Sequence, residues 1–124
     1  MSKDFMFVES HEWIKELEEG VVLIGLSQHA VDELGDLVFI DLKPEVGDTF
    51  EEGDTLADVE SVKAISEVYC PVNGSILEVN EALADAPEEL NNAPYDTWIV
   101  KMAVDSLPEG LMTEAEYLDF VKDL

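Results

Sequence analysis

The sequence predicts a mainly β fold, a flattened barrel or sandwich with a few short helices added. Short apolar or alternating runs recur between Gly, Pro, Asn and Asp residues, and no strand-helix-strand rhythm repeats. The clearest helical pattern stands at the C-terminus. With 124 residues, the chain is expected to form a single domain over residues 1–124, large enough for a modest core without metals or disulfides.

The first third of the chain predicts strands interrupted by one helix. The predicted strands cover residues 5–9, 13–17, 21–26 and 37–42. A short helix is expected over residues 28–34, because Ser27 is a good N-cap and Gly35 a good C-terminal stop. Its residues Ala30, Val31 and Leu34 are expected to face inward.

The middle of the chain predicts a β-hairpin over about residues 55–70, with Val62-Lys63 as its loop. A two-residue loop pairs Ser61 with Ala64, Val59 with Ser66 and Ala57 with Val68 on one face, and Leu56 with Tyr69, Asp58 with Glu67 and Glu60 with Ile65 on the other. The first face is mostly apolar and suited to burial. Because like charges directly opposite each other are unfavourable, the second face indicates an acidic rim kept for recognition.

The last third predicts a second hairpin, a broken helix, a strand and a final helix. Asn73-Gly74 is a strong hairpin signal, followed by a strand through residues 76–79. Residues 80–92 have the pattern of a broken helix and residues 98–104 that of a strand. The last helix is expected over about residues 113–123, opened by a Thr113–Glu116 capping box. Its apolar stripe consists of Tyr117, Phe120, Val121 and Leu124, with Met112 able to contact Tyr117.

The charge of the chain restricts its partners. Thirty acidic residues against six lysines and no arginine give a formal net charge of −24. A surface of that sign repels nucleic acids and anionic membranes, so neither is expected as a partner. It favours partners with basic docking patches. The alternative is that many of the acids serve only solubility.

Cysteine content and the N-terminus suggest a cytoplasmic protein. Cys70 is the single cysteine, so no internal disulfide is possible, which fits a reducing compartment. Residues 1–5 have neither an apolar signal core nor Arg-rich transit character. A targeting segment removed before this sequence begins would leave no trace in it.

No pattern typical of a free-standing enzyme is present. His11-Glu12 resembles the start of a zinc-protease motif, but Lys15 stands where the second histidine is required. A nucleophilic site built from His11, His29 and Cys70 has no local sequence signature. We therefore expect a protein without catalytic activity of its own and without a metal.

Lys63 remains ambiguous on physical grounds. A lysine in a turn is ordinarily a solvated side chain, and Val62-Lys63 lacks the Gly or Asn that tight hairpin turns favour. Pattern alone leaves open whether this lysine is a functional group.

The chain resembles the H-protein family of the glycine cleavage system from about His11 to Val121. The matching segments are Ser10-His11-Glu12-Trp13, residues 24–30, Glu33-Leu34-Gly35-Asp36, Val46-Gly47-Asp48, Val59-Glu60-Ser61-Val62-Lys63-Ala64, residues 71–74, residues 78–83, Pro94-Tyr95 and Trp98-Ile99. The resemblance implies a fold of the biotinyl/lipoyl type and lipoic acid bound covalently to Lys63 as N6-lipoyllysine. It makes residues 55–70 the lipoyl hairpin.

The resemblance also implies partners. The lipoyl arm would receive an aminomethyl group from glycine decarboxylase (P-protein) and present it to the aminomethyltransferase (T-protein). Dihydrolipoyl dehydrogenase (L-protein) would reoxidise the dithiol, and a lipoate ligase or a lipoyl/octanoyl transferase would attach the group. The arm would reach on the order of 12–15 Å from the lysine Cα, which raises its effective concentration at each active site.

In the family the loaded arm folds back into a cleft that shields its unstable group. By match, Glu12 and His29 would line this cleft, with Glu12 favouring the amine as an ammonium. The alternative is that both residues only stabilise local structure.

Two departures from the family and two alternative functions remain. Asp96-Thr97-Trp98 replaces a longer loop that usually has Gly before the tryptophan, and Cys70 stands where Ser or Ala is common. Val62-Lys63-Ala64 differs from the Met-Lys-Met of biotin domains and the Asp-Lys-Ala typical of 2-oxo acid dehydrogenase lipoyl domains. The alternative functions are a lipoyl relay that donates lipoate to other enzymes and an acidic interaction module that carries no lipoyl group.

Overall fold

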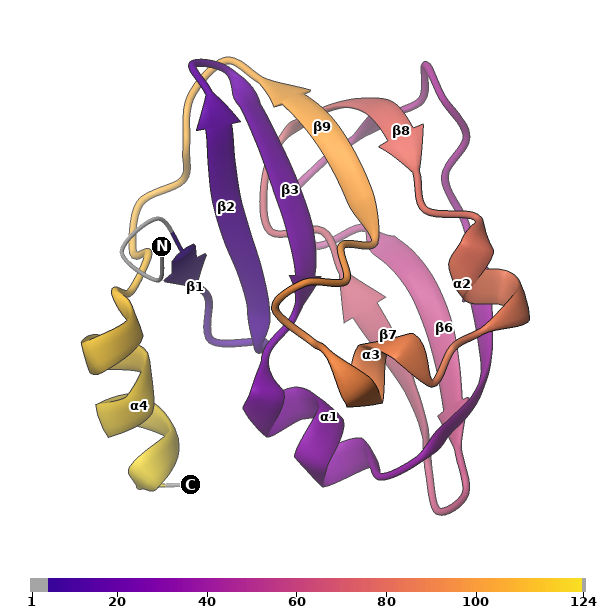
Figure 1. Cartoon of the computed structure of the whole chain (residues 1–124). Coiled ribbons are helices and arrows are strands. Elements are labelled where there is room, and N and C mark those ends of the chain that lie inside the picture. Colours follow the sequence, from indigo (N-terminus) through magenta and orange to yellow (C-terminus); the bar gives the residue numbers. More distant parts are fainter. Residues whose placement is uncertain (1–4, 124) are drawn as a thin grey trace.

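The computed structural model describes residues 5–123, which form two antiparallel sheets with four short helices (Figure 1). The strands are β1 Phe5–Phe7, β2 Glu12–Glu18, β3 Val21–Leu26, β4 Leu37–Leu42, β5 Thr49–Phe50, β6 Thr55–Ser61, β7 Ile65–Tyr69, β8 Gly74–Val79 and β9 Val100–Val104. The helices are α1 Gln28–Leu34, α2 Ala82–Asp85, α3 Glu89–Asn92 and α4 Glu114–Lys122. The predicted mainly β class with a C-terminal helix is confirmed.

The two sheets enclose the main core between them. One sheet has six strands in the order β1-β2-β3-β9-β8-β5, and the other has three in the order β4-β6-β7. Fully buried side chains from the larger sheet, such as Ile24 and Met102, share one cluster with Ile40 and Val59 of the smaller sheet. Apolar area removed from water is the main source of stability in such a core. The arrangement is the flattened barrel or sandwich that the sequence predicts.

Helix α1 has the ends that its flanking residues predict. The Ser27 side chain accepts a hydrogen bond from the Ala30 amide at 3.1 Å, and the Gly35 amide donates to the Val31 carbonyl at 3.0 Å. Gly35 has a φ of 80°, a left-handed conformation that glycine adopts without strain. Val31 is buried, and the helix connects the large sheet to β4 of the small one.

The β6–β7 hairpin has the predicted register over most of its length. Ala57 pairs with Val68, Asp58 with Glu67, Val59 with Ser66 and Glu60 with Ile65. The predicted pair of Leu56 with Tyr69 is wrong: Tyr69 pairs with Thr55, because a bulge shifts the register between Thr55 and Ala57. The bulge also explains why Leu56, expected on the outer face, is fully buried.

The predicted Asn73-Gly74 hairpin is wrong. β7 and β8 lie in different sheets, and β8 pairs instead with β5 and β9. Gly74 is needed for close packing: a Cβ there would lie 2.2 Å from the Ala103 carbonyl oxygen. The Asn73 side chain accepts a hydrogen bond from the Glu52 amide at 2.7 Å, so it joins two loops.

Two predicted strands are shorter than expected. β1 ends at Phe7 rather than at residue 9, because the His11 amide bonds back to the Val8 carbonyl at 2.9 Å and starts the return into β2. β9 begins at Val100 rather than at residue 98. Before it, the Ile99 amide already donates to the Ile24 carbonyl at 2.7 Å, outside the regular ladder.

Helix α4 begins with the predicted capping box and packs on a second, aromatic cluster. The Thr113 hydroxyl accepts from the Glu116 amide at 3.2 Å, and the Glu116 carboxylate accepts from the Thr113 amide at 2.9 Å. The cluster is centred on Phe7, Trp13 and Tyr117, with Met112, Phe120 and Val121 packed against it. Leu124, also predicted in this stripe, lies outside the described residues. Figure 1 shows α4 beside β1, the edge strand of the larger sheet.

Candidate functional site

The turn that bears Lys63 is held from two sides. The Ser61 amide donates to the Ala64 carbonyl at 2.8 Å, and the Ser61 hydroxyl accepts from the amides of Lys63 and Ala64 at 3.2 and 3.0 Å. The Val62 amide donates to the Asp36 carbonyl at 3.0 Å, which joins the turn to the end of α1. These hydrogen bonds stabilise the turn, although it lacks the Gly or Asn that tight hairpin turns favour. Ser61 is the signal that the sequence interpretation missed, because serine side chains commonly close turns onto following amides.

The Lys63 side chain lies on the protein surface above Gly35. Lys63 is exposed, and a Cβ built on Gly35 would lie 3.1 Å from the Lys63 Cε atom. A side chain at position 35 would therefore crowd the lysine as well as strain the backbone. In Figure 1 the β6–β7 turn extends past α1. The lysine is presented at the tip of a well-braced hairpin, with no ion pair to it among residues 5–123.

A cavity of about 140 Å³ lies between α1, β7 and the turn that precedes β2. Its apolar lining residues are Leu26, Ala30, Leu34, Val59 and Val68, and its polar ones are Ser10, His11, Glu12, Glu33, Ser66 and Glu67. We refer to it as the Glu12 cavity. Such a space, apolar with one deeply buried carboxylate, suits an apolar group with a cationic end.

Glu12 is a buried carboxylate whose environment favours its protonated form. Its residue exposure is 1%, and it accepts hydrogen bonds from the Ser10 hydroxyl and, at 3.2 Å, from the Tyr69 amide. Burial raises the pKa of Glu12 from 4.5 to about 7, against the opposing effect of the two hydrogen bonds. A cation entering the cavity would reverse this effect, because an opposite charge nearby stabilises the carboxylate.

The structure places His11, rather than His29, in the wall of the Glu12 cavity. The two imidazoles are neighbours, with ring centroids 4.8 Å apart, so His29 packs against His11 without lining the cavity. Burial and the nearby His29 lower the pKa of His11. The sequence interpretation considered His11 only for zinc or nucleophilic chemistry. Its position between Ser10 and Glu12 was the available signal for a cleft residue.

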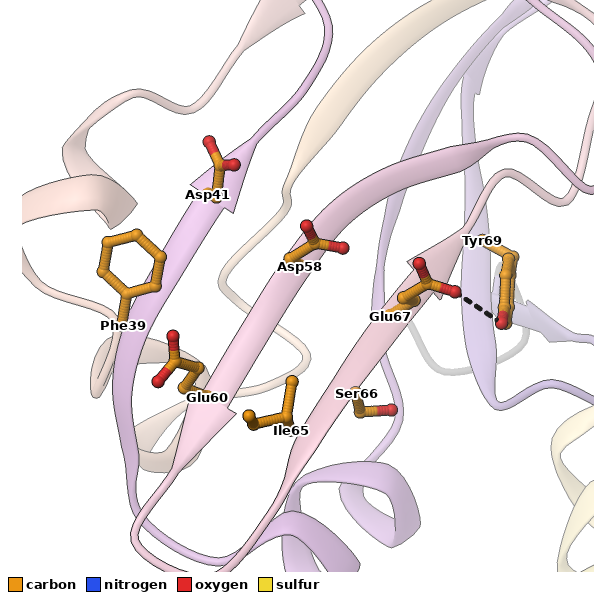
Figure 2. A pocket seen from close by; sticks show the side chains of 8 residues that line it. All are labelled: Phe39, Asp41, Asp58, Glu60, Ile65, Ser66, Glu67 and Tyr69. Carbon is orange, nitrogen blue, oxygen red and sulfur yellow. Dashed lines mark hydrogen bonds between the residues drawn. The ribbon is translucent and has the colours of Figure 1, made fainter.

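The outer face of the small sheet is acidic with an apolar border (Figure 2). A cross-strand row of three carboxylates runs from Asp41 through Asp58 to Glu67, as the predicted Asp58–Glu67 pair required. Lys43 contacts Asp41 and Asp58 at 2.8 and 3.0 Å, and Glu67 accepts from the Tyr69 hydroxyl at 2.9 Å. The next row towards Lys63 consists of Phe39, Glu60 and Ile65, with Phe39 and Ile65 exposed.

Cys70 is a buried packing residue. Its thiol donates to the Val72 carbonyl at 3.1 Å and lies 3.7 Å from the Met102 sulfur. Burial raises the pKa of the Cys70 thiol to about 11. Within residues 5–123, no cluster of three or more His, Cys, Asp or Glu side chains is arranged to hold a metal ion.

The shortened loop around Asp96 is well anchored. The Trp13 indole donates to the Pro94 carbonyl at 2.9 Å, and the Tyr95 hydroxyl accepts from the Gln28 amide at 3.0 Å. Further along, the Thr97 hydroxyl donates to the Glu89 carbonyl at 3.2 Å. The segment thereby fixes the start of α1 beside the aromatic cluster.

Comparison with known proteins decides the family. The model of the glycine cleavage H-protein family matches residues 5–124. The chain belongs to this family. It is 49% identical over 121 residues to a probable glycine cleavage system H protein of Pyrococcus furiosus, covering 95% of this chain and 90% of that protein. A glycine cleavage system H protein of Lachnoclostridium phytofermentans is 43% identical over 120 residues, covering 97% and 94%.

A solved structure agrees with this assignment. The crystal structure of a glycine cleavage system H protein from Mycobacterium marinum matches with a TM-score of 0.87 at 36% identity, covering 97% of this chain and 98% of that one. The carrier role within the glycine cleavage system follows from H-protein family membership. Membership also implies a lipoyl group and the P-, T- and L-proteins as partners. Within residues 5–123, no helix has the length and apolar character that crossing a bilayer requires.

Proposed function

We propose that Lys63 of this H-protein carries the lipoyl group as an amide and that residues 1–124 form one lipoyl-carrier domain. The observation that carries the proposal is the placement of Lys63. It is exposed on a two-residue turn that is hydrogen-bonded both to its own hairpin and, through Val62, to Asp36. A rigid mount fixes the centre from which a flexible arm sweeps, and this raises the concentration of the arm at partner active sites.

The Glu12 cavity is the proposed resting place of the loaded arm. Five apolar residues line it, which suits a hydrocarbon arm, and the buried Glu12 carboxylate suits an ammonium at the end of the arm. His29 contributes through His11, against which its ring packs at 4.8 Å, rather than by lining the space itself. The lipoyl group supplies redox and aminomethyl-transfer chemistry, while the chain supplies placement, water exclusion and a counter-charge.

The chain itself acts without catalysing a reaction, as the carrier that passes an aminomethyl group from P-protein to T-protein and a dithiol to L-protein. A lipoate ligase or a lipoyl/octanoyl transferase would attach the group. The net charge of −24 supports docking on basic surfaces of these partners. The single, buried cysteine supports a reducing compartment, the cytoplasm.

Intact mass spectrometry tests the lysine. After co-expression with a lipoate ligase, the protein should gain the mass of one lipoyl amide. Lys63→Arg should remove that gain, whereas Lys122→Arg, at an exposed lysine of α4, should retain it. An unmodified mass in the parent protein would exclude the proposal and favour the non-lipoylated interaction module. A gain that persists in Lys63→Arg would exclude Lys63 as the lipoyl site and assign the group to another of the six lysines.

Reconstitution separates the carrier from the lipoyl relay. A carrier should support glycine-dependent exchange of carbon dioxide when it is mixed with P-protein, whereas a relay should transfer lipoate to another apo-protein without glycine. We expect the lipoylated protein to support carbon dioxide exchange and Lys63→Arg to lose it. The exchange should also weaken as salt is added, because electrostatic docking is screened at higher ionic strength.

A further inference from the structure

The Tyr117 side chain joins α4 to the wall of the Glu12 cavity through a buried hydrogen-bond chain. Tyr117 is 1% exposed. Its hydroxyl lies 2.7 Å from the Ser27 hydroxyl, the N-cap of α1, and 2.7 Å from Nδ1 of His11. The ring itself stacks on Phe7, with centroids 4.5 Å apart and planes within 9°.

The hydrogens available in this network determine which group donates and which accepts in each hydrogen bond. Within residues 5–123, the Ser27 oxygen accepts the Ala30 amide hydrogen, and the Tyr117 oxygen is the acceptor within reach of the Ser27 hydroxyl hydrogen. Tyr117 must then donate its own hydrogen to Nδ1 of His11. A neutral imidazole that accepts at Nδ1 carries its hydrogen on Nε2.

The opposite direction leaves a buried group unsatisfied. If His11 were an imidazolium, Nδ1–H would donate to Tyr117, and Tyr117 would have to donate to Ser27. The Ser27 hydrogen would then have no acceptor in this network, although Ser27 is completely buried. An unmade buried hydrogen bond is costly, so the network disfavours the cationic form of His11.

His11 has further signs of being held in place. It is the non-glycine residue with a positive φ, 76°, in the described part of the chain, and such conformations persist only where the surroundings enforce them. Its amide and carbonyl are both bonded, to Val8 and Ser27 at 2.9 and 3.0 Å. Backbone and ring are thus fixed together beside the cavity.

We propose that Tyr117 is a positioning residue that holds His11 as a neutral, Nε2-protonated imidazole in the wall of the Glu12 cavity. The role of this wall rests on the proposed function, because a cationic His11 would repel an ammonium at the end of a loaded arm. A neutral imidazole leaves carboxylates as the charged groups of the cavity wall, with Glu12 the buried one among them. The C-terminal helix therefore contributes to the shielding site without lining it.

Other titratable groups around His11 modify its charge without replacing this network. They are His29 and Glu33 of α1, Glu12 of β2, Glu67 of β7 across the cavity and Tyr117 itself. Burial and His29 lower the pKa of His11, while Glu33 raises it. Tyr117→Phe removes a donor to the neutral ring and should therefore raise the pKa of His11.

The test is nitrogen-15 NMR of the two histidines in the full chain without a lipoyl group. His11 and His29 are the two histidines of the sequence, so His29→Gln assigns the signals. At neutral pH, His11 should be the Nε2–H tautomer. In Tyr117→Phe this preference should be lost, and the titration midpoint of His11 should rise by about 0.5–1 pH unit, the equivalent of one ordinary hydrogen bond. An Nδ1–H tautomer or an imidazolium in the parent protein at pH 7 overturns the proposal.

Two controls keep the result specific. Tyr95→Phe removes a hydroxyl from the same aromatic cluster that bonds to Gln28 rather than to His11, and it should leave the His11 signals unchanged. Ser27→Ala leaves Nδ1 of His11 as the remaining acceptor for the Tyr117 hydrogen, so this variant should keep the Nε2–H tautomer even if Tyr117→Phe does not fold. A change to the Nδ1–H tautomer in Ser27→Ala counts against the network.

The consequence for the cavity is measured separately. In the lipoylated and aminomethylated protein, Tyr117→Phe should lose ammonia several-fold faster than the parent at a pH where NMR finds His11 charged in the variant and neutral in the parent, and at a similar rate near pH 8. Equal rates at both pH values, with the NMR result as expected, would refute the positioning role. Absence of lipoylation at Lys63 would instead refute the proposed function and leave the NMR result to decide on the network.

Discussion

Glu12→Gln should raise the free energy of unfolding, relative to that of the parent protein, more at alkaline pH than at acidic pH. Burial raises the pKa of Glu12 from 4.5 to about 7 in the folded protein. A carboxyl group with a raised folded pKa contributes most to stability below its unfolded pKa. That contribution is lost as the pH rises through about 7. Glutamine has no charge to bury, so its contribution does not change over this range.

The size of the effect follows from the displacement of the pKa. At about 1.4 kcal/mol per pH unit, the folded protein loses about 2–3 kcal/mol from Glu12 between pH 5 and pH 8. The free energy of unfolding of Glu12→Gln, relative to the parent protein, should therefore be about 2–3 kcal/mol higher at pH 8 than at pH 5. For a domain of this size, that corresponds to a change of about 10 °C in the difference between their melting temperatures.

Urea unfolding at pH 5, 6, 7 and 8 measures this directly. Glu16→Gln is the matched control, because Glu16 lies on the same strand but is exposed. It corrects for the removal of one negative charge from a chain of net charge −24. A stability difference between Glu12→Gln and the parent that does not vary with pH, or that varies equally in Glu16→Gln, would refute the assignment of a raised pKa to buried Glu12.

Two substitutions and one labelling experiment test the fold. Gly74→Ala should cost at least about 3 kcal/mol of unfolding free energy, because its Cβ would lie 2.2 Å from the backbone carbonyl of Ala103, which has no rotamer to move aside. Thr113→Ala should lower the free energy of unfolding by about 1 kcal/mol, because it removes the N-cap of α4. The amide hydrogens of α4 should then exchange faster than in the parent protein. The Cys70 thiol should react with a disulfide reagent at pH 8 at least about 100-fold more slowly than in urea-unfolded protein, because burial raises its pKa from 9 to about 11.

For each of these experiments, one result would contradict the expectation. A Gly74→Ala protein as stable as Ser75→Ala, its neighbour on β8, would mean that the strands separate without cost. An unchanged exchange rate in α4 would mean that packing of the aromatic cluster, rather than the cap, determines its stability. Rapid labelling of Cys70 in the folded state would mean that the core around Met102 opens readily.

Local sequence rules determined the elements whose signals are themselves local. The ends of α1 and the capping box of α4 were predicted because a cap is made by residues three apart in the chain. The β6–β7 register was predicted because a two-residue loop leaves one way to pair the strands beyond it. The placement of Lys63 on that loop was likewise available from the sequence, but its role as a lipoyl lysine came from family resemblance.

Tertiary structure decided what depends on residues far apart in the chain. Asn73-Gly74 has the local pattern of a hairpin, yet β8 pairs with β9. The pairing of a strand depends on the burial of its whole apolar face more than on the preference of one turn. The bulge that buries Leu56 likewise depends on burial rather than on a local sequence pattern. Sequence predicted Glu12 as a cleft residue by match alone. His11 is next to Glu12 in the sequence, but only the fold places both in one cavity wall and joins His11 to Tyr117, 106 positions away. A buried polar group takes whichever partner the packed elements place within reach.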